Sequence, residues 1–483
     1  MSKRPNIVYV FADQLRYDAL GCTGNAQAQT PNIDRFAKSA AAFTNAVVNT
    51  PVCTAYRASF MTGKHTTSHG MVINELRMNP NQRGLGHMLT DAGYNTSYIG
   101  KWHLYANELG AHYEARNSFV PRGPHRLGFE GEWKAFNFHH ENFSPPAYYH
   151  EETPDKLTYG PGEYEATVQT DQAIDFIARA ARDPEGKPFS LILSYGPPHD
   201  PWGPDNVPER FWRMFENERF PNPPNYRNED DAPYNDKWAG LSPAERDELE
   251  SWRRGYFAQV ASLDAEFGRL MAALDGSGQA ENTIVVFTSD HGEMFGAHGR
   301  RAKLIFYEEA AHVPFIVRWP GHIPAGSLPD VCLSTVDILP TLAGLAQLPV
   351  SSAVEGIDVS QTVLGQGGVE PEFALLQGCG ATAIWEDGHE WRAIRDKRFT
   401  YGVFRIDGKE CLFDRLADPF QMTNLADDPA FADVKQGLKS AMAERMASIG
   451  DTFEASSWYR DHWTDGNRRI LRSATEDFGL HPE

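Results

Sequence analysis

Short apolar runs separated by longer amphipathic segments are the clearest pattern along the chain. Runs of this length, without polar interruptions, are typical of strands buried on both faces of a sheet. Between them, apolar residues recur at helical spacing. The segments predicted to be strands are 6–11, 189–195, 283–290 and 313–319, and those predicted to be helices are 32–40, 85–92, 163–180 and 243–274.

The longest predicted helix carries its own start signal. Ser242 stands at the N-cap position, Pro243 in the first turn and Glu245 at capping-box spacing. Alternating strands and helices predict an α/β fold in which a large, mostly parallel sheet is sandwiched by helices. In such folds ligands bind beyond the carboxyl ends of the strands.

Two segments and the C-terminal region depart from this alternation. Residues 113–164 and 197–234 are rich in Pro, Gly, His and aromatic residues, as functional loops are. After Leu364 the pattern changes to short alternating strands at 390–404 and a helix near 431–446. We therefore expect a catalytic domain over 1–364 and a smaller C-terminal α+β domain over 365–483, with a short antiparallel sheet and a helix.

Composition and charge restrict the class of partner. The chain has 483 residues, of which 41% are hydrophobic, enough for a large core, and a formal net charge of −20. That charge argues against nucleic acid and anionic membranes as partners and favours a small substrate. The five scattered cysteines form no disulfide or zinc pattern. No signal peptide or membrane span is evident, so we expect a cytoplasmic protein; oligomeric state leaves no signal.

Polar side chains follow the two clearest strands at the point where each ends. Asp13 and Gln14 follow the first strand, and Asp290 and His291 end the strand at 283–290. Oxygen ligands suit Ca²⁺ or Mg²⁺, and the histidine leaves Mn²⁺ or Zn²⁺ open. Taken singly, Asp13 could cap a helix and Asp290 could start a turn. Together, at two strand ends, they favour a divalent metal site.

Cys53 stands at the start of a predicted helix, in a setting unusual for a packing cysteine. Small, polar and basic residues follow it, and Arg57 lies one turn along the same face. The positive end of a helix dipole favours a bound oxyanion. A nucleophile, a dipole and a guanidinium would thus converge on one tetrahedral anion, although a lone cysteine is more often an inert core residue.

The segment "CTAYRASFMTGKH" resembles the signature of the type I sulfatases of the alkaline phosphatase superfamily. Cys53, Ala55, Arg57, Thr62 and Gly63 match its Cys-x-(Pro or Ala)-x-Arg and Thr-Gly positions. The resemblance extends over nearly the whole chain, because further motifs agree in order. These are "VFADQLRYDALGCTGN", "TPNIDRFAKSAAAFTNAV", "GYNTSYIGKWHL", "GPPHDPW", "TSDHGEMFGAHG", "YEEAAHVPFIVRWPG" and "FDRLADPFQMTNLADDP".

The resemblance implies an enzyme that hydrolyses sulfate monoesters. A formylglycine-generating maturase would oxidise Cys53 to formylglycine, an aldehyde that hydrates to a geminal diol and attacks sulfur. Asp13, Gln14, Asp290 and His291, together with position 53, would hold one divalent metal, most often calcium in this family. The second hydroxyl of the diol would then lose a proton so that sulfate leaves, which a serine could not achieve.

The resemblance also implies roles for side chains elsewhere in the chain, each of which pattern alone could assign to ordinary surface or turns. Arg57 would stabilise the formylglycine hydroxyl and its metal contact, and Asn74 would line the substrate pocket. The remaining residues hold the sulfate and move protons, with His199 or Lys303 as donor and His103 as acceptor. They are Lys101, His103, His199 and Lys303.

Two departures keep other activities open. Many sulfatases have Asp and Asn where this chain has Gln14 and His291, and phosphonate monoester and phosphodiester hydrolases of the same superfamily share the Gln/His pair. Those relatives lack residues corresponding to Lys101 and His103, which favours a sulfatase.

Ala55 and Tyr56 depart from the commoner Pro and Ser of the signature, which bears on how efficiently Cys53 is modified. A non-catalytic binding protein would need a broken metal set or no nucleophile, and neither is found.

Aromatic residues interleaved with His, Asn and Glu suggest the substrate. They occupy 129–143, 145–150 and 198–212, and sugars stack on aromatic rings while their hydroxyls form hydrogen bonds. Many of these rings will also pack the loops against the domain. We expect a small sulfated saccharide, with aryl or alkyl sulfates as an alternative.

Overall fold

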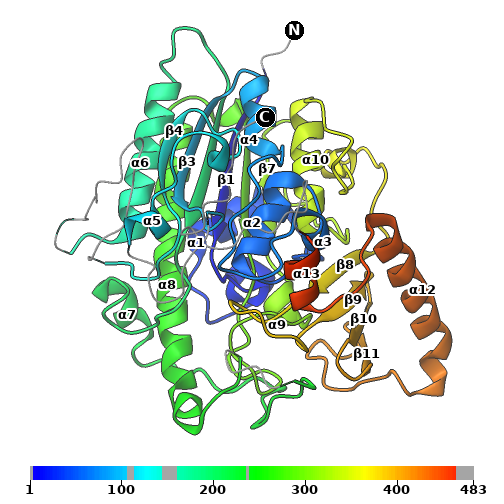
Figure 1. Ribbon diagram of the computed structural model, residues 1–483. Helices are drawn as coiled ribbons and strands as arrows, with labels where there is room; N and C mark the ends of the chain where they lie inside the picture. The colour runs from blue at the N-terminus through cyan, green and yellow to red at the C-terminus, as the bar shows by residue number, and fades with distance from the viewer. Residues whose placement is uncertain (1–3, 106–113, 144–159, 161, 235–238, 464–483) are drawn as a thin grey trace.

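The computed structural model describes residues 4–105, 114–143, 160, 162–234 and 239–463. A seven-stranded sheet runs through the centre of the molecule, with strand order β2-β7-β6-β1-β5-β3-β4 (Figure 1). Its strands are β1 (Asn6–Ala12), β2 (Ala41–Phe43), β3 (Asn95–Lys101), β4 (Glu132–Phe136), β5 (Phe189–Tyr195), β6 (Thr283–Ser289) and β7 (Phe315–Arg318).

The apolar runs form the centre of this sheet because both of its faces are buried. In β1, Ile7, Tyr9 and Phe11 contribute to the core on one face, while Val8 and Val10 contribute to the core on the other. The first core includes side chains of α2 and α10, and the second includes side chains of α1, α6 and α8. Helices therefore cover both faces, and the predicted sandwich is confirmed.

The predicted helices and strands form, with ends that shift by a few residues. The capping box of Ser242 and Glu245 starts α8 as predicted. The helices are α1 (Pro31–Lys38), α2 (Cys53–Thr62), α3 (Thr66–His69), α4 (Leu85–Asp91), α5 (Ala115–Ser118), α6 (Glu165–Ala180), α7 (Glu209–Phe215), α8 (Pro243–Gly276), α9 (Glu308–Ala311), α10 (Thr335–Ala346), α11 (Ser360–Val363), α12 (Ala432–Ile449) and α13 (Ser456–His462).

The sheet is mixed rather than parallel throughout. β1 pairs in parallel with β5 and β6, and β3 pairs in parallel with β5 and β4, whereas β7 runs antiparallel to both β6 and β2. The two segments predicted to be irregular also contain regular elements that the pattern did not indicate. β4 forms within 113–164 and α7 within 197–234. β4 could not be predicted because it has only five residues. Two of them, Glu132 and Lys134, are charged, so the segment contains no apolar run like those of the other strands.

A second sheet, entirely antiparallel, follows in the C-terminal region with strand order β11-β10-β9-β8 (Figure 1). One face packs against residues such as Phe306 and Tyr307 of the large domain, and α12 covers the other. The strands are β8 (Ala374–Gly378), β9 (Trp391–Arg395), β10 (Phe399–Phe404) and β11 (Glu410–Asp414). The predicted sheet and helix are thus present, and the division at 364/365 stays a prediction.

A buried hydrogen-bond network that includes one ion pair joins the small sheet to the segments on either side of α2. Arg392 donates two hydrogen bonds to Asp451, at 2.6 and 2.8 Å, and both side chains are fully buried. Asp451 also accepts from Gln377, whose amide oxygen in turn accepts from the backbone of Thr66 at 3.0 Å. The backbone N–H of Gln377 donates to Asn49 at 2.7 Å. The small sheet therefore contacts residues on both sides of Cys53.

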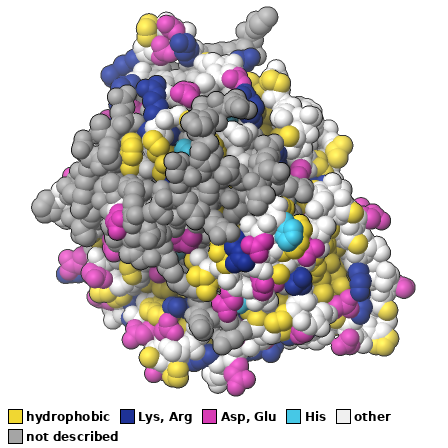
Figure 2. Space-filling view, viewed as in Figure 1, with side chains coloured by type: hydrophobic (Ala, Val, Ile, Leu, Met, Phe, Trp, Pro, Cys, Tyr) yellow, Lys and Arg dark blue, Asp and Glu magenta, His cyan; other side chains and the backbone are white. Residues whose placement is uncertain are grey.

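Charged side chains of both signs are spread over the described part of the face shown in Figure 2. Within the described residues, no helix combines the length and apolarity needed to cross a bilayer.

Gly100 provides a test of how tightly β3 is placed beside β5. Its φ of +100° disfavours any side chain, and a Cβ there would lie 2.0 Å from the carbonyl oxygen of Ser194. We expect Gly100→Ala to lower the free energy of unfolding by more than about 3 kcal/mol, since backbone strain and overpacking add. Gly93 is the matched control, because its φ is +80° but a Cβ there would meet no atom within 4 Å. Gly93→Ala should cost only about 1–2 kcal/mol; equal losses in urea titrations would contradict the steric argument.

Candidate active site

The carboxyl edge of the central sheet gathers the residues that follow its strands. Asp13 and Gln14 come directly after β1, and Asp290 and His291 directly after β6. β1 and β6 are parallel neighbours, so both pairs emerge side by side. Gln14 donates its backbone N–H to the Asp290 carboxylate at 3.0 Å, which fixes one pair against the other. Lys101, the last residue of β3, reaches the same edge.

Cys53 is the first residue of α2, and its side chain lies at the centre of this group. The sulfur lies 3.1 Å from His291 Nε2, 3.7 Å from Asp13 Oδ1 and 3.2 Å from Lys303 Nζ. Burial alone would raise the pKa of the thiol, but Lys101, Lys303 and His291 lower it well below its usual value. Position 53 is therefore a place where negative charge is stabilised.

The donor set around Cys53 fits a divalent cation. Ligand atoms of Asp13, Cys53, Asp290 and His291 all lie within 4.8 Å of one another, and all four residues are buried. The ring nitrogen Nδ1 of His291 contacts the carbonyl oxygen of Gly292 at 2.9 Å, which leaves Nε2 to face the cluster. Two carboxylates, an imidazole and the neighbouring amide of Gln14 are suitable ligands for Ca²⁺, Mg²⁺ or Mn²⁺.

The two carboxylates differ in their electrostatic surroundings. Burial and the Cys53 sulfur raise the pKa of Asp13, but Lys101 and other nearby cations outweigh them and hold it at about 2. Burial and the charge of Asp13 raise the pKa of Asp290. Among the described residues, Lys101 contacts Asp13 and not Asp290. Additional positive charge beside Asp290 would relieve the repulsion between the two carboxylates.

Arg57 lies behind the two carboxylates rather than in the pocket. Its guanidinium donates to Asp13 at 3.3 Å and to Asp290 at 3.2 Å, as well as to the hydroxyl of Ser194 at 2.8 Å. It is 1% exposed and does not belong to the residues that line the pocket described below. The guanidinium therefore contacts the carboxylates of Asp13 and Asp290 rather than the pocket, and its convergence with Cys53 on one anion stays a prediction.

Two lysines approach Cys53 from different segments of the chain. Lys101 donates to Asp13 at 2.6 Å, lies 4.0 Å from the Cys53 sulfur and sits over the ring of Phe138. Lys303 contacts the Cys53 sulfur, and the charges of Cys53 and Asp13 raise its pKa against the opposing effect of burial. Two lysine side chains from different segments therefore lie within 4.0 Å of the Cys53 sulfur.

Two histidines next to Cys53 differ in protonation. Burial lowers the pKa of His103 to about 3, so its imidazole is neutral. His199 is also buried, which opposes protonation, but Asp200 and Asp13 raise its pKa to about 9. The Nδ1 of His199 contacts the Asp200 carboxylate at 2.9 Å, and its Nε2 lies 3.2 Å from Lys303 Nζ. An anionic oxygen between His199 and Lys303 would accept a hydrogen bond from each.

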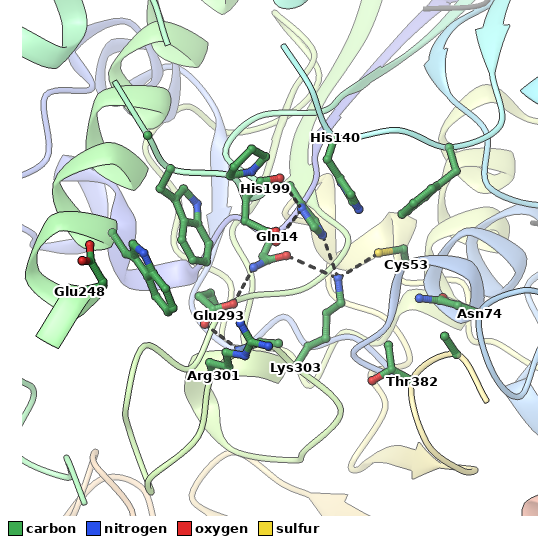
Figure 3. Close-up of a pocket in the computed structure, with 18 of the residues that line it drawn as sticks. Gln14, Cys53, Asn74, His140, His199, Glu248, Glu293, Arg301, Lys303 and Thr382 are labelled. Atoms are coloured by element: carbon green, nitrogen blue, oxygen red, sulfur yellow. Dashed lines mark hydrogen bonds and ion pairs between the residues drawn. The ribbon is translucent and has the colours of Figure 1, made fainter. Parts of the chain in front are cut away.

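A pocket of about 600 Å³ opens above this group (Figure 3). Asn74 lines the pocket. Its side-chain oxygen accepts hydrogen bonds from the hydroxyl of Thr54 at 2.9 Å and from the backbone N–H of Thr54 at 3.4 Å. The pocket also contains Cys53, His199 and Lys303, as predicted. The predicted site residues thus come together from the ends of β1, β3 and β6, from α2, and from the segments that follow α3, β3, β5 and β6.

Several pocket residues were not predicted individually from the sequence. Phe138 and His140 come from 129–143, and Trp202 comes from 198–212, two segments expected to contact substrate; the third segment, 145–150, lies outside the described residues. Glu293 follows His291 by two positions and could have been found in the "DHGE" motif. Thr382 carried no signal, because its C-terminal region was predicted to be a separate domain.

With this geometry established, family comparison identifies the class of protein. The sulfatase family profile matches residues 5–348, and the profile of the N-sulphoglucosamine sulphohydrolase C-terminal region matches 296–448. The chain belongs to the sulfatase family of the alkaline phosphatase superfamily and is a sulfuric ester hydrolase.

Curated relatives align with almost the whole chain. An ulvan-active sulfatase of Formosa agariphila is 33% identical over 94% of this chain and 84% of its own length. An N-acetylglucosamine-6-O-sulfatase of Bacteroides thetaiotaomicron is 26% identical over 93% of this chain and 88% of its own length.

Solved structures share the fold. The yidJ protein of Bacteroides fragilis superposes with a TM-score of 0.81 at 26% identity, covering 93% of this chain and 97% of its own. The phosphonate monoester hydrolase of Agrobacterium radiobacter superposes with a TM-score of 0.71 at 22% identity, covering 92% and 96%. The fold is thus shared with the phosphonate monoester hydrolase as well as with the yidJ protein, which is described as a sulfatase.

The contacts of Arg57 lead to a prediction about stability. Arg57→Met would leave two adjacent buried carboxylates without their shared guanidinium, so the free energy of unfolding in chelator-treated protein should fall by about 3–5 kcal/mol. Arg301→Met is the control, because Arg301 is 33% exposed and pairs with the part-exposed Glu245; it should cost less than about 1 kcal/mol. Urea titration measures the free energy of unfolding of both variants. Similar losses would show that the contacts of Arg57 with Asp13 and Asp290 do not stabilise the fold.

Proposed function

We propose that this chain hydrolyses the sulfate monoester of a small sulfated saccharide, with a formylglycine made from Cys53 and one divalent cation, preferably calcium. The observation that carries the proposal is the position of Cys53, which lies at the N-terminus of α2 and within 4.8 Å of three buried metal-ligand side chains, at the floor of the pocket. A formylglycine-generating maturase would be a required partner.

The metal would be held by Asp13, Gln14, Asp290, His291 and position 53. This set is supported by the donor chemistry and by the unequal electrostatics of the two carboxylates. The cation would supply positive charge against the negative charge that develops on a sulfuryl group, and the hydrated aldehyde would supply an oxygen nucleophile that can later release the sulfate.

The remaining residues of the site would bind the sulfate and move protons. Lys101 and Lys303 are placed to hold sulfuryl oxygens on either side of position 53. His199, oriented by Asp200 and facing Lys303, is placed to donate a proton to the leaving oxygen. His103 is buried beside Cys53, and its low pKa keeps the ring neutral. As a neutral ring beside position 53 it is the assigned proton acceptor when sulfate is released, a role that requires its basicity to rise once the anionic ester is bound.

The pocket walls support a saccharide as the group that carries the sulfate. Trp202 and Trp252 provide apolar surface, while Asn74, Glu75 and Glu248 offer hydrogen-bonding groups. Sugars present both kinds of surface. Two relatives, the ulvan-active sulfatase and the N-acetylglucosamine-6-O-sulfatase, are named for saccharides, which supports the same class of substrate here.

Phosphonate monoester or phosphodiester hydrolysis is the second candidate, because Gln14 and His291 occupy the metal edge. Lys101 and His103 favour the sulfatase, because the phosphonate and phosphodiester hydrolases lack the corresponding residues. In this chain Lys101 contacts Asp13 at 2.6 Å, and His103 is buried. Aryl and small alkyl sulfates are a further alternative, since a good leaving group needs less help from a proton donor.

Mass spectrometry of the tryptic peptide 39–57 tests the nucleophile. Protein produced with a maturase should show an aldehyde in place of the Cys53 thiol, and only this form should turn over repeatedly. In Cys53→Ser, attack by the hydroxyl would break the S–O ester bond, release the protonated alcohol and leave the sulfuryl group on Ser. We expect one equivalent of alcohol and a peptide heavier by one sulfuryl group. Repeated turnover by the serine variant or by fully unmodified protein would contradict the proposal.

A substrate panel tests the specificity. Sulfated mono- and disaccharides, an aryl sulfate, a phosphonate monoester and a phosphodiester are compared by kcat/KM with the same enzyme preparation. We expect a sulfated saccharide to give the highest kcat/KM and the aryl sulfate to be turned over as well. Preference for the phosphonate or phosphodiester would establish the second candidate, and strong aryl sulfate turnover with inert saccharides would exclude the saccharide.

A further inference from the structure

Gln14 and Glu293 form a short side-chain contact at the edge of the metal group. Gln14 Nε2 lies 2.5 Å from Glu293 Oε2, and both side chains are buried. The amide nitrogen of Gln14 is the donor in this contact and a carboxylate oxygen of Glu293 is the acceptor, so the amide turns its NH₂ group toward Glu293. The amide oxygen then points in the opposite direction.

Glu293 is itself held in place. Its other carboxylate oxygen, Oε1, accepts the backbone N–H of Phe295 at 3.1 Å and that of Ala302 at 2.7 Å. The backbone of Gln14 is equally constrained, because its N–H donates to Asp290 and its carbonyl oxygen accepts from the hydroxyl of Tyr256 at 2.8 Å. The contact therefore joins a carboxylate held by two backbone N–H groups to a residue whose backbone is held at both its N–H and its carbonyl group. The remaining freedom of the Gln14 amide is a flip that exchanges its oxygen and its NH₂ group.

The amide oxygen of Gln14 faces the reactive side of the site. It lies 3.4 Å from Lys303 Nζ, and the same nitrogen lies 3.2 Å from the Cys53 sulfur (Figure 3). We propose that Glu293 is a positioning residue that orients the Gln14 amide so that its oxygen, not its NH₂ group, faces the metal and Lys303. This inference rests on the proposed metal site and extends it by one residue.

Glu293→Gln is the variant that isolates this role. The new amide keeps an oxygen for Phe295 and Ala302, so the loop retains its contacts. Its NH₂ group would replace Oε2 and oppose the NH₂ group of Gln14. Gln14 must then flip to accept a hydrogen bond, which directs its own NH₂ group at the metal and Lys303.

The measurement is calorimetric titration of chelator-treated protein with Ca²⁺ alone, with the state of position 53 matched by mass spectrometry. We expect Glu293→Gln to weaken Ca²⁺ binding by about 10–100-fold, the range seen when outer partners of metal ligands are lost. Its melting temperature without metal should stay close to that of the wild type. Glu309→Gln is the matched control, since Glu309 is also buried and accepts from an amide, that of Asn225, at 2.7 Å; it should leave Ca²⁺ affinity unchanged.

A second substitution provides the decisive rescue. In the double variant Gln14→Glu with Glu293→Gln, the carboxylate at 14 accepts from the new amide and still presents an oxygen to the metal. Ca²⁺ affinity should return at least to the wild-type value, and it should exceed that of Gln14→Glu alone, in which two carboxylates oppose each other across the contact. Because both variants carry the charged ligand at position 14, equal affinities would show that charge alone explains the recovery and would overturn the orienting role.

The outcomes separate this inference from the proposed function. If the wild type fails to bind Ca²⁺, Mg²⁺ or Mn²⁺, the metal site itself is wrong and the inference falls with it. If the wild type binds and Glu293→Gln binds equally well, or if the double variant does not recover affinity, the orienting role of Glu293 alone is overturned.

Discussion

Burial of two carboxylates within one small space is the constraint on which the rest of the structure depends. Asp13 and Asp290 are both fully buried at neighbouring strand ends. Charges removed from water in this way require compensation from nearby groups of opposite sign. The Arg57 guanidinium supplies positive charge to both carboxylates, and Lys101 supplies it to Asp13. The positions of α2 and β3 follow from this requirement as much as from apolar packing.

The same constraint explains the chemistry of the pocket floor. Anionic and cationic side chains are held close together in a buried setting, so each shifts the protonation of its neighbours. His103 and His199 consequently differ in pKa although both are buried, because Asp200 contacts His199 and raises its pKa. One buried site thus holds a neutral and a protonated imidazole at the same pH.

Much of the fold and of the candidate site could be predicted from the sequence, for reasons that the structure makes clear. The strands β1, β5 and β6 are buried on both faces, so their apolar runs are uninterrupted, and the residues that follow β1 and β6 had to meet at one edge. The antiparallel course of β7 could not be read from its apolar run, because periodicity carries no strand direction. The position of Arg57 behind the carboxylates was equally out of reach, since helical spacing alone does not show which side of a buried cluster a guanidinium will occupy.

The C-terminal region closes the pocket rather than standing apart from it. The backbone N–H of Asn74 donates to the carbonyl oxygen of Thr382 at 2.8 Å, so one wall joins segments from opposite ends of the chain. During synthesis, a nascent chain that has emerged only through β7 already contains each of the proposed reacting groups. It still lacks the wall at Thr382 that bounds the cavity. All the proposed reacting groups are therefore synthesised before the segment that bounds their cavity, and the pocket is complete only after the C-terminal region has emerged.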